Sequence, residues 1–378
     1  MAFKHDTRAH AVLSASASKR WMSCPPSAML CAEIPDVETD YAREGTLAHE
    51  LAEWKVNKLL GTEAPKPEID PQFYSSEMET CTDDYAAYIA EVIAKYEDPT
   101  VLVEQRLDLS DYVPDSFGTA DCIIVADEVL TVVDYKNGKG VPISAVRNPQ
   151  MFLYALGALR IFDCLYDISE VHTVIFQPRL ENISEDTISV ADLKTWAEQE
   201  LRPKAELAAK GEGEFCAGDH CRFCKVKATC RKRAEYSMIL AKYDFTPPAL
   251  LEDTEIEAIL SRCDDLTAWA SDVKEYALAQ ALSGKEWSGF KVVEGRSKRE
   301  FTDKKKVAAV VEEAGKSPYK KPELLGIIEM TKLLGGAKKF NALLGEWVVK
   351  PQGKPTLVPA SDKRPVWNTA ENDFKEET

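Results

Sequence analysis

The sequence predicts an α/β protein with a mixed central β-sheet flanked by helices. Before residue 100, apolar residues recur at helical spacing. From Thr100 onward the pattern changes to the apolar, β-branched runs that are typical of strands. The expected order is helix, three strands, helix, strand, helix, which favours an α/β core followed by a cysteine-rich segment and a mostly helical C-terminal region.

Two helices are expected before the sheet. Residues 40–61 carry Leu47, Leu51 and Trp54 on one helical face, with Gly61 as the stop. A second helix is expected at about 83–96.

Four strands are expected, at 101–109, 119–125, 129–136 and 171–178. The second and third form an antiparallel hairpin that turns around Asp127.

Two further helices and a separate C-terminal region complete the expected organisation. Asn148 and Pro149 are the predicted cap and first residue of a helix that continues to residue 162, and 191–210 is the next helix. After the cysteines we expect helix to about Leu282, a strand-like run at 289–295 and a Lys-rich helical stretch. The expected domains are 1–240, which carries the chemistry, 241–365, a mainly helical region that binds DNA or a partner, and 366–378, a disordered acidic tail.

Composition limits the classes of protein to which this chain can belong. In 378 residues, 45% hydrophobic and 29% charged, no apolar run approaches the length of a membrane span. The N-terminus lacks the apolar core of an export signal, so the ten cysteines are expected in a reducing cytoplasm, where disulfides are rare. The net charge of −16 argues against a basic coat, although Arg222 to Arg233 contains basic residues and no acid.

The predicted hairpin contains candidate metal-binding and catalytic residues. If it turns around Asp127, Asp121 lies opposite Val133 or Asp134, and Lys136 shares a face with Asp134. Two close carboxylates repel each other unless a cation neutralises them, and their hard oxygen atoms suit Mg²⁺ or Mn²⁺. The lysine fits phosphodiester hydrolysis, in which it orients water or stabilises phosphoryl charge. A surface hairpin with an exposed D-Y-K remains the alternative.

Three helical residues could join this group. His49 precedes the sheet and could supply a neutral imidazole to the same metal, or could be an ordinary half-buried helix histidine. Gln150 and Tyr154 are four residues apart and therefore share a helix face, which could equally be a helix surface beside a core tyrosine.

Taken in order, these residues resemble the RecB-type branch of the PD-(D/E)XK nuclease superfamily. The resemblance covers roughly residues 14–235 and extends to bacteriophage RecB-like exonucleases, to CRISPR-associated adaptation nucleases and to the AddB nuclease domain. Four motifs carry it, G-T-L-A-H at 45–49, G-T-A-D at 118–121, D-Y-K at 134–136 and Q-x-x-x-Y at 150–154.

The resemblance implies a restriction-endonuclease-like core and specific roles for these residues. Metal ligands would be the side chains of His49, Asp121 and Asp134 together with the backbone carbonyl of Tyr135. Lys136 would be the catalytic lysine. Gln150 and Tyr154 would position DNA or that lysine, and Glu104 is a candidate additional acidic group.

The same resemblance implies a metal-dependent DNA exonuclease that acts on single strands or DNA ends in phage recombination or replication. Such a protein would be phage-encoded, would work in the bacterial cytoplasm away from membranes, and would have a single-strand annealing or replication protein as a candidate partner. Two other hypotheses stay open: a nuclease-fold scaffold that binds DNA ends without cutting them, and a zinc-bearing interaction protein. The candidate DNA-binding residues are Arg222, Lys225, Lys227 and Arg231.

The cysteine-rich segment allows two kinds of metal centre, with no metal at all as the third alternative. Local spacing fits a zinc knot formed by Cys216, Cys221, Cys224 and Cys230. By resemblance to iron–sulfur nucleases, Cys24 would instead join the last three around a [4Fe–4S] cluster, leaving Cys216 as a surplus residue. The remaining cysteines lack ligand spacing and are expected to be small buried hydrophobes; they are Cys31, Cys81, Cys122, Cys164 and Cys263.

Overall fold

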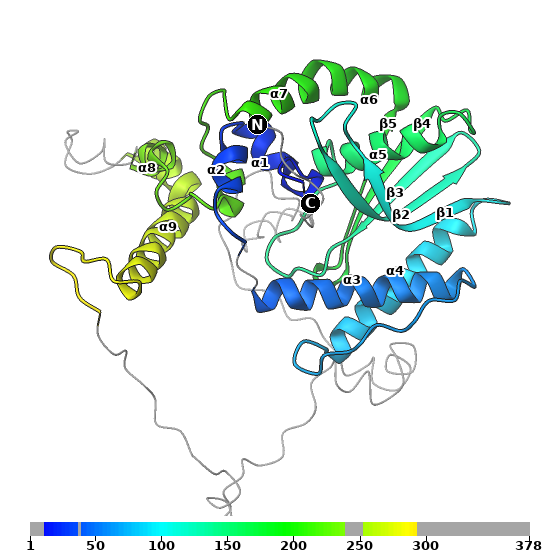
Figure 1. Ribbon diagram of the computed structural model, residues 1–378, viewed down its shortest axis with the longest axis horizontal. Coiled ribbons are helices and arrows are strands. Elements are labelled where there is room, and N and C mark those ends of the chain that lie inside the picture. The colour runs from blue at the N-terminus through cyan, green and yellow to red at the C-terminus, as the bar shows by residue number, and fades with distance from the viewer. Residues whose placement is uncertain (1–10, 37–38, 239–251, 293–378) are drawn as a thin grey trace, which may run out of the picture. The chain divides into compact units, whose positions relative to one another are not determined.

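A computed structural model describes residues 11–36, 39–238 and 252–292 (Figure 1). The chain divides into two compact units, Met1–Gln280 and Ala281–Thr378. This division falls 40 residues after the boundary at 240 that the sequence suggested. The sheet and all the candidate site residues belong to the first unit.

The centre of the first unit is a mixed sheet of five strands in the order β1-β2-β3-β4-β5. Strands β3 and β4 run parallel, and every other neighbouring pair is antiparallel. The mixed sheet and its first four strands confirm the sequence prediction. The strands are β1 (Thr100–Asp108), β2 (Phe117–Ala126), β3 (Val129–Tyr135), β4 (Glu170–Gln177) and β5 (Asn182–Ser189).

The sequence pattern predicts four strands and does not predict β5. It pairs with β4 over its whole length, from Gln177 opposite Asn182 to Glu170 opposite Ser189. Its residues alternate between exposed and half-buried, and none is fully buried. Backbone hydrogen bonds at the sheet edge, rather than apolar side chains, therefore define this strand.

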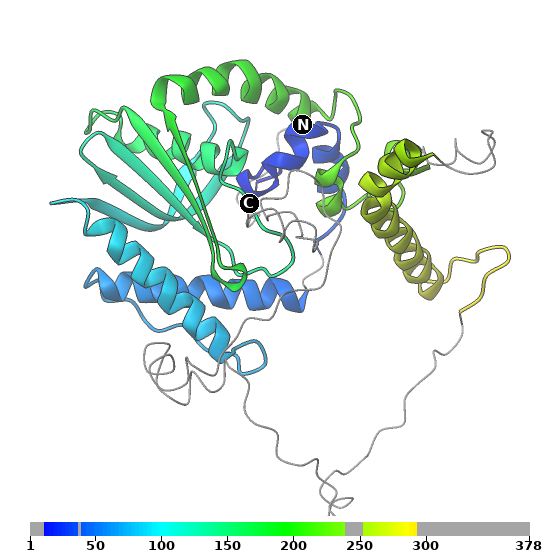
Figure 2. The same ribbon diagram turned by 180° about the vertical axis from the view of Figure 1, so that it is seen from behind.

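Helices cover both faces of the sheet and create two separate cores (Figures 1 and 2). Ile123 and Val132 point toward the face covered by α5, α6 and α7, whereas Ile124 and Val133 point toward α3 and α4. This alternation follows from the two-residue period of a strand. The helices are α3 (Asp40–Leu59), α4 (Ser76–Ile93), α5 (Pro149–Phe162), α6 (Val190–Trp196) and α7 (Arg202–Lys210).

Helix boundaries follow local capping residues. The Asn148 side chain accepts a hydrogen bond from the N–H of Gln150 at the start of α5, with Pro149 as the first residue, as predicted. Helix α4 begins well before residue 83 because the Ser75 hydroxyl caps it. The expected helix 191–210 is present as α6 and α7, joined by one π-helical turn, η4 (Ala197–Leu201).

A short N-terminal segment packs against α7 and the cysteine-rich segment within the first unit. It contains η2 (Ala15–Ala17), α1 (Ser18–Ser23) and α2 (Ser27–Ala32), and both α1 and α2 contact α7. The Ser116 hydroxyl, just before β2, donates to the Leu13 carbonyl over 2.7 Å. Residues 13–32 are therefore packed onto the fold, next to the cysteine-rich segment that contains η5 (Asp219–Phe223) and α8 (Arg231–Ser237).

The C-terminal region contributes one described helix, α9 (Asp253–Leu282), in agreement with the expected helical segment. Residues 289–292 of the expected strand-like run form no strand, and 293–295 lie outside the described residues. The Lys-rich stretch and the acidic tail also lie outside them. In the described residues, no helix combines the length and the apolar character that crossing a bilayer requires.

Candidate active site

The two predicted aspartates meet where the β2–β3 hairpin opens. Backbone pairing ends at Cys122 opposite Val133, so Asp121 and Asp134 occupy the next facing positions. The N–H of Tyr135 then donates to Asp121 Oδ2 over 2.7 Å. Lys136 Nζ lies 2.8 Å from Asp134 Oδ2 and donates to Oδ1 over 3.1 Å. The structure confirms the predicted convergence of these carboxylates and the ammonium, with Asp134 almost fully buried.

A third carboxylate extends this arrangement across the sheet. On β1, Val103 faces Cys122 and Gln105 faces Ala120, which puts Glu104 opposite Asp121. Glu104, Asp121 and Asp134 thus lie in one row across three neighbouring strands. Glu104 adopts a φ of 48°, a left-handed conformation that is strained for a non-glycine residue.

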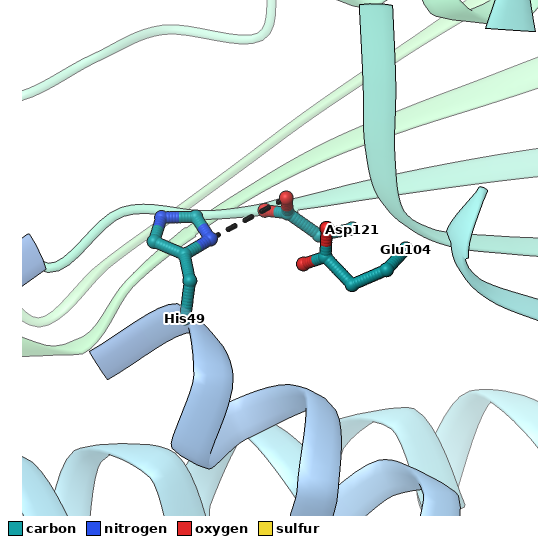
Figure 3. Close-up of side chains that lie close together, drawn as sticks. All are labelled: His49, Glu104 and Asp121. Atoms are coloured by element: carbon teal, nitrogen blue, oxygen red, sulfur yellow. Dashed lines mark ion pairs between the residues drawn. The ribbon is translucent and has the colours of Figure 1, made fainter. Parts of the chain in front are cut away.

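His49 reaches the row from α3, as Figure 3 shows. Its Nδ1 lies 3.4 Å from Asp121 Oδ1, and its ring packs edge-on against Tyr135 with centroids 5.4 Å apart. One ligand atom from each of His49, Glu104 and Asp121 lies within 4.8 Å of the others. These three side chains could therefore bind one divalent cation together.

Burial and neighbouring charges shift the pKa values of the three carboxyl groups at the site. Burial raises the pKa of Glu104 to about 7, and the nearby Asp121 carboxylate adds to the effect. Burial also raises the pKa of Asp134, although Lys136 opposes this shift. For Asp121 burial is again the largest effect and acts to raise the pKa, but His49, Lys136 and the N–H of Tyr135 together outweigh it, so its pKa is lowered. Strong mutual repulsion of this kind is what a bound cation would relieve.

For the two cationic side chains at the site, burial acts to lower the pKa and the neighbouring carboxylates act to raise it. Burial acts to lower the pKa of Lys136, but the Asp134 and Asp121 carboxylates together overcome this effect and raise it. Burial also acts to lower the pKa of His49, but the Asp121 and Asp134 carboxylates together outweigh burial and raise it. Lys136 therefore carries its proton at neutral pH and can donate a hydrogen bond to an anion.

The Q-x-x-x-Y and G-T-A-D motifs meet at the same place. Gln150 Nε2 donates to Asp134 Oδ1 over 3.0 Å and to the Tyr154 hydroxyl over 3.3 Å. A Cβ on Gly118 would lie 2.8 Å from Tyr154 Cε1, which is closer than atoms can approach. A glycine at this position therefore allows the Tyr154 ring to lie against β2.

The predicted cysteines gather around a second site. Cys24, Cys221, Cys224 and Cys230 line one cavity, and Cys216 lines it as well. Basic side chains share the lining; they belong to Arg20, His220, Lys227 and Arg233.

Cys31 also reaches this cluster, which spacing did not predict. Its Sγ lies 3.8 Å from that of Cys224, and the N–H of Lys225 donates to it over 3.4 Å. The contact with Cys224 lowers the pKa of Cys31 to about 5. The expectation that the unassigned cysteines are buried is confirmed for Cys31, Cys81 and Cys122. It is wrong for Cys164, which is exposed, and for Cys263, which is half-exposed.

Comparison with known families identifies a match over residues 10–365 to the family described as "Protein of unknown function (DUF2800)". The chain belongs to the DUF2800 family. The match includes the sheet, the carboxylate row, the cysteine cavity and α9. A solved structure titled "Crystal structure of SSO0001" is similar at 17% identity, over 50% of this chain and 98% of that chain, with a TM-score of 0.21.

The basic residues of this DUF2800 protein fall into two groups. Lys225 is bound by Asp36 at 2.7 Å, and Lys227 by Asp272 at 2.6 Å. Arg222 and Arg231 are exposed and form no ion pair within the part of the chain that the structure describes. Of the four candidate DNA-binding side chains, these two therefore remain available to an external anion.

Proposed function

We propose that this DUF2800 protein is a divalent-metal-dependent deoxyribonuclease, an exonuclease that hydrolyses phosphodiester bonds in single-stranded DNA or at DNA ends. The observation that carries the proposal is the row of Glu104, Asp121 and Asp134 with Lys136 at one end and His49 beside it. A role in phage recombination or replication, together with a single-strand annealing or replication partner, follows from the sequence resemblance alone.

The residues present fit a divalent cation. Ligand atoms of His49, Glu104 and Asp121 lie within 4.8 Å of one another and would hold it. By the sequence resemblance, Asp134 and the backbone carbonyl of Tyr135 would join this ligand set. Buried carboxylates that repel one another are stable when a cation neutralises them. When bound, Mg²⁺ or Mn²⁺ supplies a Lewis acid and lowers the pKa of coordinated water.

The chain's own residues would position and stabilise the reacting phosphate. Lys136, held by Asp134 at 2.8 Å, would donate to a non-bridging phosphoryl oxygen and stabilise the charge that grows there. Gln150 fixes the orientation of Asp134 through Oδ1, and Tyr154 in turn contacts Gln150. This hydrogen-bonded chain keeps the carboxylate in one rotamer, as a preorganised site requires.

For the cysteine cavity we propose a [4Fe–4S] cluster held by Cys24, Cys221, Cys224 and Cys230. The fit is supported by the common cavity that these four residues line. A centre bonded to both ends of the nuclease domain would join the N-terminal segment to the cysteine-rich segment without disulfides.

A zinc centre is a second candidate for the cavity. The distance between two cysteine sulfur atoms favours it. The 3.8 Å between the Sγ atoms of Cys31 and Cys224 matches the edge of a tetrahedral zinc–thiolate site, about 3.8 Å for Zn–S bonds of about 2.3 Å. Metal analysis of the purified protein separates the two candidates, because only the cluster contains iron and acid-labile sulfide.

Cleavage of end-labelled DNA tests the nuclease proposal. Purified protein is incubated with single- and double-stranded substrates and Mg²⁺ or Mn²⁺, beside Asp134→Ala and Lys136→Ala. Lys194→Ala and Asp163→Asn are matched controls, since these exposed residues pair with each other away from the site. We expect metal-dependent shortening from the ends that both site variants abolish and both controls retain.

Two outcomes would contradict the proposal. Degradation that survives both site substitutions would come from another site or a contaminant. DNA binding without cleavage under either metal would support the nuclease-fold scaffold instead.

A further inference from the structure

We propose that Phe223 is a stacking platform for one nucleobase of single-stranded DNA, with Arg222 contacting the neighbouring phosphate. The inference rests on the proposed nuclease function and names the part of the protein that would select single strands.

The fold holds Phe223 outward. It ends η5 and lies between Cys221 and Cys224, which are each only 7% exposed, whereas the Phe223 side chain is 78% exposed. Backbone hydrogen bonds from Cys221 to Gly218 and from Cys224 to Cys221 fix the turn on both sides. The ring is therefore attached to a constrained backbone. Because this backbone is ordered before binding, stacking of a ligand on the ring costs little conformational entropy of the protein.

The surroundings of the ring favour a nucleic acid over an apolar protein partner. Arg222, its direct neighbour, is exposed and has no ion pair among the described residues. Lys225, two residues further on, is also charged, although Asp36 binds it. An exposed aromatic ring beside free cationic charge can bind a base and a phosphate at once, whereas a protein interface would need a broad apolar patch.

Arg222, the neighbour of Phe223, lies against the loop that leads away from the candidate active site. A Cβ on Gly140 would be 3.9 Å from Arg222 Nη2, so the guanidinium rests against the loop that follows β3. Gly140 is four residues after Lys136, a span of at most about 14 Å of extended chain. A strand stacked on Phe223 would thus be held within a few nucleotides of the lysine.

Stacking on an external ring discriminates between substrates. Bases of a single strand are free to leave their neighbours and lie on Phe223, whereas bases of an intact duplex are already stacked on both faces. Loss of the ring should therefore weaken binding of single strands and leave binding of duplex DNA almost unchanged.

Binding measurements on Phe223 variants test the inference. The full-length Asp134→Asn protein, which should bind without cutting, is titrated with fluorescent oligothymidine and with a duplex of equal length in EDTA. We expect Phe223→Ala to weaken single-strand binding at least about fivefold and to change duplex binding less than twofold. Phe223→Trp should restore single-strand affinity, and Phe223→Leu should not.

Two further variants separate stacking from other effects. Leu165→Ala, which removes another exposed apolar side chain at 71% exposure, should not change affinity. Arg222→Ala should reduce the slope of log affinity against log salt by about one, as expected for one lost phosphate contact. Iron content and thermal melting confirm that each variant is loaded and folded.

Unchanged single-strand affinity in a folded Phe223→Ala protein would overturn the inference, as would full rescue by Phe223→Leu. The proposed nuclease function would survive either result if the wild-type protein still cleaves DNA. Conversely, Phe223-dependent binding by a wild-type protein that never cleaves would support the platform and refute the nuclease.

Discussion

The Sγ atoms of Cys31 and Cys224 lie 3.8 Å apart although 193 residues separate them in the chain. Both side chains are buried, and Cys224 also lines the cavity that contains Cys24. Cys24 and Cys31, both in the N-terminal segment, are therefore the two candidates for the upstream ligand of the proposed metal centre.

Substitution of these two cysteines distinguishes the centres. We expect Cys24→Ser to lose the brown iron-dependent absorption and Cys31→Ala to keep it, because Cys24 lines the cavity with the other three ligands. Iron and zinc contents of the purified variants are the measurement. Zinc that is lost only with Cys31→Ala would show a zinc–thiolate site and contradict the cluster.

Gly118→Ala should disturb catalysis through Tyr154. The added Cβ would lie 2.8 Å from the Tyr154 ring and push it away from Gln150. We expect single-turnover cleavage to slow about 10- to 100-fold, as for other small displacements of positioning groups. In a Tyr154→Ala background the same substitution should have little further effect, and additive losses would show that the contact does not matter.

Stability of the metal-free protein should fall as pH rises from 4.5 to 7. Glu104 has its pKa raised from the usual 4.5 to about 7, so in this window the folded state binds more protons than the unfolded chain. Urea unfolding in EDTA should show a loss of up to about 3 kcal/mol that Glu104→Gln removes. The exposed Glu91→Gln is the control, and equal pH slopes in the wild-type and Glu104→Gln proteins would contradict the assignment.

Asp272 should hold α9 against α8. Its carboxylate lies 2.8 Å from Arg233, which is 2% exposed, and 2.6 Å from Lys227. Asp272→Ala would leave a buried guanidinium with only the more distant Asp265, at 3.7 Å, and should cost roughly 3 kcal/mol locally. We expect faster proteolysis within α9, unlike in Asp264→Ala, whose side chain is exposed; identical cleavage rates would contradict this role.

Gly157→Ala should destabilise the fold although alanine favours helices. A Cβ there would lie 2.8 Å from side-chain atoms of Leu107 and Leu109, which fill the core beneath α5. Overpacking of this kind costs about 1–3 kcal/mol, more than the gain of about 1 kcal/mol in helix propensity. Gly45→Ala in α3 has open space and should stabilise instead. Thermal melting compares the two variants, and a stabilised Gly157→Ala would contradict this packing.

Much of the fold was predictable because its signals are local. The β2–β3 hairpin with its turn at Asp127, the Asn148 cap and the apolar faces of α3 and α5 all depend on residues close in sequence. Strand β5 was not predictable in this way. Its sequence, NISEDTIS, buries no side chain, and its place follows from the free edge that β4 offers.

The sequence by itself determined the chemical inventory, namely Asp121, Asp134, Lys136 and the cysteines, because motif spacing and strand alternation bring such residues to one end of a hairpin. Only the tertiary structure decided which other residues contact them. The opening of the ladder after Cys122 lets His49 and Tyr135 reach Asp121, and chain folding places Cys31 on Cys224. Contacts between distant segments depend on how helices and strands pack, and that packing leaves no periodic trace in the sequence.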